Sequence, residues 1–81
     1  LALGPEPLAR GFTPAVLAAA LATTRSAIKP ALLDQRIVAG LGNIYAAEAC
    51  WHAALAPQRV ASALPPESIT ALVAAIKQVL R

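Results

Sequence analysis

The sequence is poor in the residues that supply most protein chemistry. It contains one cysteine, one histidine, four acidic residues and no methionine. Cys50 therefore has no partner for an internal disulfide, and the chain has no secretory signal pattern, so we expect a reducing, cytoplasmic setting. Cys50 and His52 are two residues apart and point to different sides of a helix, and no other Cys or His is present to complete a metal site. We expect no cofactor in this chain.

Groups for acid–base or nucleophilic catalysis are also scarce. His52 has no nucleophile arranged beside it, the carboxylates are scattered, and no glycine-rich loop has the P-loop spacing. We expect Asp34 to bond the turn or pair with Arg36, and Glu48 to help hold the turn before the third helix. The longest apolar run, 15–22, is far shorter than the roughly 20 residues that span a bilayer. The sequence thus predicts neither a large independent active site nor a membrane span.

Length and composition indicate one small helical domain. The chain has 81 residues, and its hydrophobic fraction of 58% is inflated by alanine, the strongest helix former. No run of β-branched and aromatic residues predicts a strand. The net charge of +3 permits a polyanionic partner without requiring one. Because the chain starts with an apolar segment and no methionine, we expect it to be a fragment of a longer protein.

The first quarter of the chain contains a lead-in and a helix. Residues 1–11 include Gly4, Pro5 and Pro7, which predict an extended lead-in. Thr13 as N-cap and Pro14 at the first helical position begin the first helix, and Phe12 is placed to pack on a leucine inside it. The side chains expected to face the core, besides Phe12, are Val16, Leu17, Ala20 and Leu21.

The stretch 25–48 predicts a helix, two turns and a second helix. Pro30 suits the first position of a short helix that runs on to Gln35. Gly40 offers a left-handed stop, and Gly42 is a second position free to take a positive φ. Asn43 is a favoured N-cap for a helix that begins at Ile44.

Two further helices complete the expected fold. The third runs from 44 to about 54, ended by Pro57, with Cys50 buried and Trp51 as a core anchor. Its core-facing stripe is expected to be Ile44, Ala47, Trp51 and Leu55. Pro65 and Pro66 begin the fourth helix, in which Glu67 and Lys77 complement the helix dipole. Its apolar stripe is Ile69, Leu72, Val73, Ile76 and Leu80.

The start of the third helix is a candidate phosphate site. A helix N-terminus presents unpaired N–H groups and a partial positive charge, and Gly42 has no side chain to exclude an anion. Lys29 and Arg25, four residues apart, are candidates to add two cations to the same surface. On spacing alone, the alternative that these glycines and Asn43 serve only chain reversal and capping stays open.

Four segments of the chain resemble one family. They are L-G-P-E-P-L at 3–8, A-I-K-P-A-L-L-D-Q at 27–35, V-A-G-L-G-N-I-Y-A-A-E at 38–48 and A-P-Q-R-V-A-S-A-L at 56–64. Together they resemble the helix-two-turn-helix domain of formamidopyrimidine-DNA glycosylase. The resemblance spans nearly the whole chain and implies a single all-α domain over 1–81, with four helices.

The resemblance also implies what the parent protein does. Enzymes of this family excise oxidised purines from damaged double-stranded DNA in base excision repair, as combined glycosylases and AP lyases. They use an N-terminal proline amine as nucleophile and carry a C-terminal zinc finger. Neither that proline nor the four zinc cysteines have a counterpart here, so we expect the fragment itself to be inactive and the zinc to belong to the missing finger. The implied setting is the bacterial cytoplasm, at the nucleoid, as a monomer.

Five residues match DNA-contacting positions of the family. Asn43 matches an asparagine that holds a phosphate beside the damaged nucleotide, together with backbone amides of the turn. Lys29 matches a lysine near the lesion, and Arg25 stands where the family commonly has a DNA-contacting lysine. Gly42 and Tyr45 lie in the matched motif, with Tyr45 expected either to pack or to bind.

The sequence leaves three alternatives open. The sister endonuclease VIII group shares the G-x-G-N turn, although the A-I-K segment resembles the formamidopyrimidine branch. A non-enzymatic nucleic-acid-binding module is the second alternative, because ribosomal and topoisomerase proteins use a similar unit. The third is a purely structural helical bundle, which would show no salt-dependent DNA binding.

Overall fold

The structure, a computed structural model, describes residues 3–81, so the first two residues of the expected lead-in lie outside it. The described residues form four α-helices and one short 3-10 helix, and no strand longer than an isolated bridge. The prediction of an all-α fold is confirmed. The elements are α1 (Pro14–Leu21), α2 (Ile28–Leu33), α3 (Asn43–His52), η1 (Ala61–Ala63) and α4 (Pro66–Leu80).

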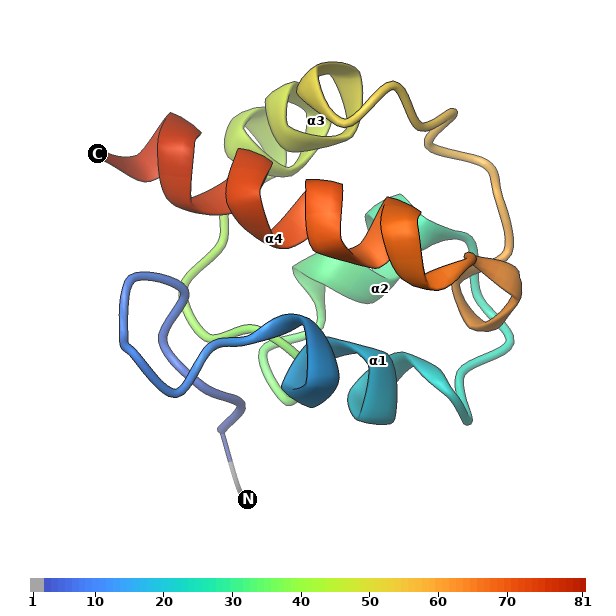
Figure 1. Cartoon of the computed structure of the whole chain (residues 1–81), viewed down its shortest axis with the longest axis horizontal. Coiled ribbons are helices and arrows are strands. Elements are labelled where there is room, and N and C mark those ends of the chain that lie inside the picture. Colours follow the sequence, from blue (N-terminus) through green and yellow to red (C-terminus); the bar gives the residue numbers. More distant parts are fainter. Residues whose placement is uncertain (1–2) are drawn as a thin grey trace.

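The longest helix, α4, organises the packing. It lies against both α1 and α3, while α2 packs against α3 (Figure 1). Its predicted stripe is confirmed: four of the five side chains are buried and Leu80 is partly buried. Among the described residues no polar or charged side chain is buried, so the core is held by apolar contact alone.

The start of α1 follows the sequence prediction. Thr13 Oγ1 accepts a hydrogen bond from the Val16 amide at 3.2 Å, Pro14 occupies the first position, and Phe12 is buried. Val16 itself is exposed, so its expected core position is wrong. The buried residues of α1 are Leu17 and Leu21, one turn apart, and Val16 lies off that line.

The third helix differs most from expectation. It ends at His52, and its buried side chains are Ala46, Ala49 and Cys50. The predicted burial of Cys50 is confirmed, whereas Trp51 is 77% exposed and is no core anchor. The physical reason is the close packing of α3 against α4, because small side chains allow two helix backbones to approach.

The predicted core stripe of α3 is therefore wrong along most of its length. Ile44 is 71% exposed and Ala47 is only partly buried, although Leu55, just beyond the helix, is buried as expected. Within α3, the large apolar side chains of this stripe, Ile44 and Trp51, lie off the small-residue face that packs against α4. None of the helices in the described part of the chain is long and apolar enough to cross a membrane.

Residues 3–11 form no helix or strand, as expected, but they are docked on the domain. The Gly4 amide donates to the Gln35 carbonyl at 2.9 Å, and the Ala39 amide donates to the Pro5 carbonyl at 3.1 Å. A Cβ on Gly4 would lie 2.6 Å from the carbonyl group of Ile37, so a glycine is required by this close approach. The lead-in thus supports the segment between α2 and α3.

Lys77 fixes the other end of the lead-in. Its Nζ donates to the Ala9 carbonyl at 2.9 Å and lies 5.6 Å from the centre of the Phe12 ring. This tertiary role was not predicted, because the sequence indicated only a favourable position near the end of α4. Glu67 lies in the first turn of α4, as expected.

Candidate functional site

The short helix α2 starts earlier than predicted. It begins at Ile28, which makes Pro30 its third residue, and it ends at Leu33. A proline is tolerated there because the first N–H groups of a helix have no partner within it. The start of α2 is instead fixed from outside: the Ile28 amide donates to the Arg59 carbonyl at 2.7 Å, and the Lys29 amide donates to the Pro57 carbonyl at 3.3 Å.

Asp34 closes the first of the two turns, and its predicted pairing with Arg36 is confirmed. One carboxylate oxygen accepts from the Arg36 amide at 2.9 Å and from Nε at 3.0 Å, and the other accepts from the guanidinium at 2.7 Å. These hydrogen bonds to Arg36 lower the pKa of Asp34 to about 2, and the carboxylate raises the pKa of Arg36 in return. The role of Asp34 in the described residues is structural.

Gln35 and Gly40 define the second turn. Gly40 has a φ of +78°, which confirms the predicted left-handed stop. The Gly40 amide donates to Gln35 Oε1 at 2.6 Å, and Gln35 Nε2 donates to the Leu33 carbonyl at 3.3 Å. The bridge that Gln35 forms between Gly40 and Leu33 was not predicted. The sequence carries no signal for it other than the place of Gln35 in the A-I-K-P-A-L-L-D-Q segment at 27–35.

Two predictions at the start of α3 need correction. Gly42 has a φ of −85° and a ψ of 167°, so it does not take a positive φ. It is also the N-cap, and its carbonyl accepts the first helical hydrogen bond from Ala46 at 2.9 Å. Asn43 is therefore the first helical residue and its side chain makes no capping hydrogen bond. The extended backbone of Gly42 takes the capping position, which leaves the Asn43 amide group unused within the described residues.

The N-terminal end of α3 is open. The backbone N–H groups of Asn43, Ile44 and Tyr45 have no acceptor among the described residues, and all three residues are exposed. A Cβ on Gly42 would meet nothing within 4 Å, so no atom of the described residues lies against that side of Gly42. Exposed N–H groups and the helix dipole together favour an anion at this position.

The structure does not place the two predicted cations at that end. The start of α2 is bonded to 57–59, which follow α3, so Lys29 lies toward the C-terminal end of α3 and not at its start. Burial raises the pKa of the Cys50 thiol, and the positive charge of Lys29 offsets part of that rise. This agrees with a position of Lys29 toward the C-terminal end of α3. Arg25 lines a different groove, of about 410 Å³, together with Asp34 and Arg36. Tyr45, 45% exposed, does lie beside the open end.

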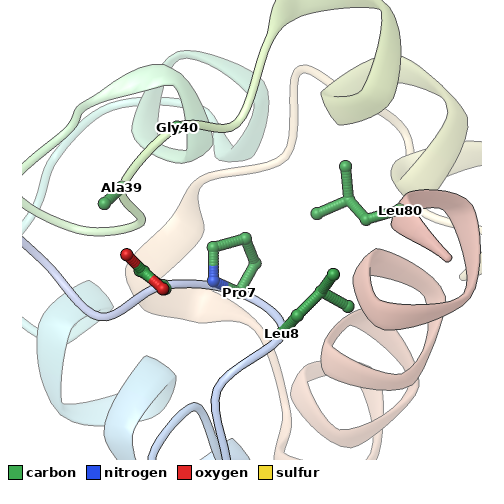
Figure 2. Close-up of a pocket in the computed structure, with 6 residues that line it drawn as sticks. Pro7, Leu8, Ala39, Gly40 and Leu80 are labelled. Atoms are coloured by element: carbon green, nitrogen blue, oxygen red, sulfur yellow. The ribbon is translucent and has the colours of Figure 1, made fainter.

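A second groove lies next to the open end. It has a volume of about 330 Å³ and is formed by the lead-in, the turn before α3 and the end of α4 (Figure 2). Its lining residues are Glu6, Pro7, Leu8, Ala39, Gly40 and Leu80. Glu6 is the one carboxylate in this lining and no nucleophile accompanies it, so the groove has no acid–base pair for catalysis.

The remaining predicted polar contacts are weak or absent. Glu48 is exposed and its side chain makes no hydrogen bond among the described residues, so its expected role in holding the turn is wrong. Cys50 is buried whereas His52 is exposed, and within 3–81 no three His, Cys, Asp or Glu residues cluster closely enough to hold a metal ion.

Two helices joined by two tight turns, with the second helix open at its start, define a helix-two-turn-helix domain. The family model of the formamidopyrimidine-DNA glycosylase H2TH domain matches residues 3–81, and the chain belongs to this family.

Similar proteins are several times longer than this chain. The chain is 54% identical over 78 residues to formamidopyrimidine-DNA glycosylase of Paracoccus denitrificans, covering 96% of this chain and 28% of that protein. The MutM (Fpg) protein from Thermus thermophilus superposes with a TM-score of 0.91 at 44% identity, covering 96% of this chain and 29% of that one. Lactococcus lactis Fpg, solved with DNA containing an abasic site, gives 0.88 at 38% identity with the same coverage. The chain spans less than a third of each relative.

Proposed function

We propose that this chain is the domain of a longer DNA glycosylase and AP lyase that holds the DNA backbone while oxidised purines are excised. The observation that carries the proposal is the open N-terminal end of α3, where three N–H groups and the Asn43 amide have no partner among the described residues. The relatives support it: one is solved with abasic-site DNA, and MutM is solved with DNA containing carbocyclic 8-oxo-G.

A DNA phosphate fits the open end on physical grounds. The N–H groups of Asn43, Ile44 and Tyr45 lie in the first turn of α3, and the Asn43 side chain adds amide donors. Gly42 lets the phosphate approach without a side chain in the way, because nothing lies within 4 Å of its would-be Cβ. Hydrogen bonds to an anion are stronger than those between neutral groups, so a few such donors suffice to fix one phosphate.

The cations then bind other phosphates. Lys29 lies toward the opposite end of α3 and Arg25 lines the groove beside Arg36, so neither serves the phosphate held by Asn43. Duplex DNA carries one negative charge per roughly 1.7 Å of its axis, so cations spread over one surface meet successive phosphates. Tyr45, half exposed beside the open end, is placed to flank the bound phosphate.

The chemistry of base removal belongs to other parts of the parent protein. Asp34 is paired with Arg36 and its pKa of about 2 makes it a poor proton carrier at neutral pH. His52 is exposed beside Trp51, and its ring makes no hydrogen bond to a nucleophile among the described residues. We place the nucleophilic amine and the zinc ion of the parent outside these 81 residues, and we propose a monomeric protein of the bacterial cytoplasm.

The test compares the 81-residue chain with the whole parent protein. Both are titrated with duplex oligonucleotides that carry oxidised guanine or normal guanine at one position. The chain is expected to bind either duplex at a Kd of ~10⁻⁴ M or weaker, more weakly still as salt rises, and to cleave neither. The parent is expected to cleave only the damaged duplex.

Two outcomes would contradict the proposal. Cleavage by the 81-residue chain would show that the catalytic groups lie within it. Binding by the parent that shows no dependence on salt would favour a structural helical bundle, because phosphate contacts release counterions and always weaken as salt rises.

A further inference from the structure

The side of α3 that faces away from the core carries an exposed apolar stripe. Ile44, Glu48 and Trp51 are spaced by four and three residues, so they share one face of the helix, and all three are exposed. We call these three residues the Trp51 face. The Trp51 indole is stabilised on one side by an edge-to-face contact with the His52 ring, at a centroid distance of 5.0 Å. The rest of it is open, since Trp51 is 77% exposed.

A face of this kind is unusual for a surface left in water. Exposed Ile and Trp side chains on one helix face form an apolar patch, and such patches mark places where another surface binds. The core does not need these residues, because α3 packs on α4 through Ala46, Ala49 and Cys50. The Trp51 face is thus available to a partner without any rearrangement of the fold.

The charge of the face favours protein over DNA. Glu48 lies between Ile44 and Trp51 on the same stripe, and a carboxylate there repels a phosphate backbone. The proposed phosphate position, by contrast, is formed by the backbone N–H groups at the start of the helix, where no acidic residue lies in the first turn. The same helix therefore presents an anion-binding end and a separate apolar face with a negative charge.

The path of the chain indicates the occupant. Leu80, at the end of α4, lines the same groove as Ala39 and Gly40, which precede α3 (Figure 2). Polypeptide that continues from Arg81 would leave α4 at the end that lies beside the beginning of α3 (Figure 1). The lead-in is placed elsewhere, because Gly4 is bonded to Gln35 at the end of α2.

We propose that the Trp51 face is the docking surface for the polypeptide that follows residue 81 in the parent protein. This inference rests on the proposed function, in which the chain is part of a longer enzyme. The matching surface would present apolar side chains to Ile44 and Trp51 and a basic side chain or N–H donor to Glu48. Docking there fixes the following segment relative to the phosphate held at the start of α3.

Trp51 itself provides the measurement, because it is the one tryptophan of this chain. Its fluorescence and its quenching by acrylamide are measured in the 81-residue chain and in the DNA-free parent. The Trp51 signal in the parent is obtained as the difference between the parent and its Trp51→Phe variant. We expect emission shifted to shorter wavelength and a several-fold lower quenching constant in the parent. Equal quenching in both proteins would overturn the proposal, as would protection that arises only when DNA is added.

A stability comparison provides an independent readout. Trp51→Ala is expected to lower the melting temperature of the parent by a few degrees and to leave that of the 81-residue chain unchanged. Val60→Ala is the matched control, because Val60 is 48% exposed and lies outside α3, and it should change neither protein. An equal effect of Trp51→Ala on both proteins would mean that the indole acts within the domain and would overturn the proposal.

Failure of this inference is distinguishable from failure of the proposed function. DNA cleavage by the parent is measured on the same preparations. A parent that cleaves damaged DNA while Trp51 stays fully accessible would refute the docking surface alone. A parent in which Trp51 is protected but which cleaves no DNA would support the docking surface and refute only the assigned activity.

Discussion

The backbone groups at the two ends of α3 differ in their hydrogen bonding. At the C-terminal end, the Leu55 amide donates to the Cys50 carbonyl at 2.8 Å and the Ala54 amide donates to the Trp51 carbonyl at 3.0 Å. This is the Schellman arrangement, with Ala54 in the left-handed conformation at a φ of 57° and Leu55 buried. At the N-terminal end, three N–H groups have no acceptor among the described residues.

The contrast distinguishes the end of the helix that the chain closes by itself from the end at which we propose that DNA binds. This chain has the means to close a helix start, because Thr13 caps α1 with a side-chain hydrogen bond. At α3 the corresponding position is Gly42, which has no side chain to donate or accept. At the closed end, backbone groups of the chain itself supply the hydrogen bonds. At the open end, the free N–H groups are satisfied by water or by a ligand. Substitutions at the two ends should accordingly separate folding stability from DNA binding.

The largest expected effect is that of Asn43→Asp on DNA binding by the parent. The substitution removes the amide donors and sets a negative charge against the phosphate, which in a partly desolvated contact costs on the order of several kcal/mol. Folding stability should change by less than ~1 kcal/mol, because a carboxylate in the first turn suits the helix dipole. DNA titrations and thermal melts of the same variant measure the two effects.

Asn43→Ala is the control for this substitution. Because Asn43 is the first helical residue and not the N-cap, its truncation should change stability by no more than ~0.5 kcal/mol, below the roughly 0.5–2 kcal/mol typical of a lost cap. Its DNA affinity should fall between those of the wild type and Asn43→Asp. Binding of Asn43→Asp as tight as wild type would remove Asn43 from the proposed phosphate site.

The next largest effect is expected on folding stability, where the lead-in supports the turn before the open end of α3. Gly4→Ala places a Cβ 2.6 Å from the Ile37 carbonyl group, and relief of that clash requires backbone movement, with a loss of roughly 1–3 kcal/mol of stability. Gly11→Ala is the matched control, because nothing lies within 4 Å of its would-be Cβ. Chemical denaturation of both variants tests this. Equal stability of the two would mean that the lead-in does not hold the turn before α3.

A gain in stability is expected at the closed end. Ala54 takes a left-handed φ that side-chain-bearing residues adopt at a cost, so Ala54→Gly should stabilise the fold by about 0.5–1 kcal/mol. The control, Ala47→Gly, lies inside α3 and should destabilise by about 1 kcal/mol. DNA affinity of the parent should be the same for Ala54→Gly as for wild type. A loss of affinity would show that the two ends are coupled.

Lys29→Ala tests whether the lysine and Asn43 bind different phosphates. Loss of one phosphate contact should reduce the log–log salt slope of DNA binding by about 0.9. Since Lys29 and Asn43 are near opposite ends of α3, the effects of Lys29→Ala and Asn43→Ala on binding should add within about 0.5 kcal/mol. An unchanged salt slope would leave Lys29 with a structural or base-contacting role. A strong deviation from additivity would place both residues on one phosphate.

Features set by local chemistry could be predicted from the sequence. The start of α1 at Thr13 and Pro14, the start of α4 after Pro65 and the left-handed Gly40 each depend on a few neighbouring residues, and all are confirmed. The α4 stripe was also predictable, because its apolar residues recur over fifteen positions. Asp34 and Arg36 are two residues apart, so their pairing needed no knowledge of the fold.

Features that depend on tertiary approach could not be predicted. Periodicity identified an apolar stripe through Ile44 and Trp51, but it does not tell whether a stripe faces the core of its own domain or another surface. The face of α3 with small side chains lies in the core because it allows close packing on α4. The role of Gly4 depends on Ile37, more than thirty residues away, and no local pattern reports such a contact. The shift of the cap from Asn43 to Gly42 is a one-residue difference in backbone conformation, beyond the precision of sequence patterns.

The smallest expected effect is the pH dependence that the Asp34 and Arg36 pair adds to the first turn. The folded-state pKa of Asp34 is lowered from 3.8 to about 2, so the unfolded chain takes up this proton first as the pH falls. The contribution of the pair is therefore present above pH 4 and is lost as the pH falls from about 4 to about 2. Arg36 is exposed, so the effect should be modest and should shrink further as salt rises. Asp34→Asn keeps an oxygen to accept from the Arg36 amide but removes the charge, and its melting temperature should vary less between pH 4 and 2 than that of the wild type. An Asp34 carboxyl that titrates near 3.8 in NMR of the folded chain would show that the ion pair does not persist in solution, and the first turn would then depend on its backbone hydrogen bonds alone.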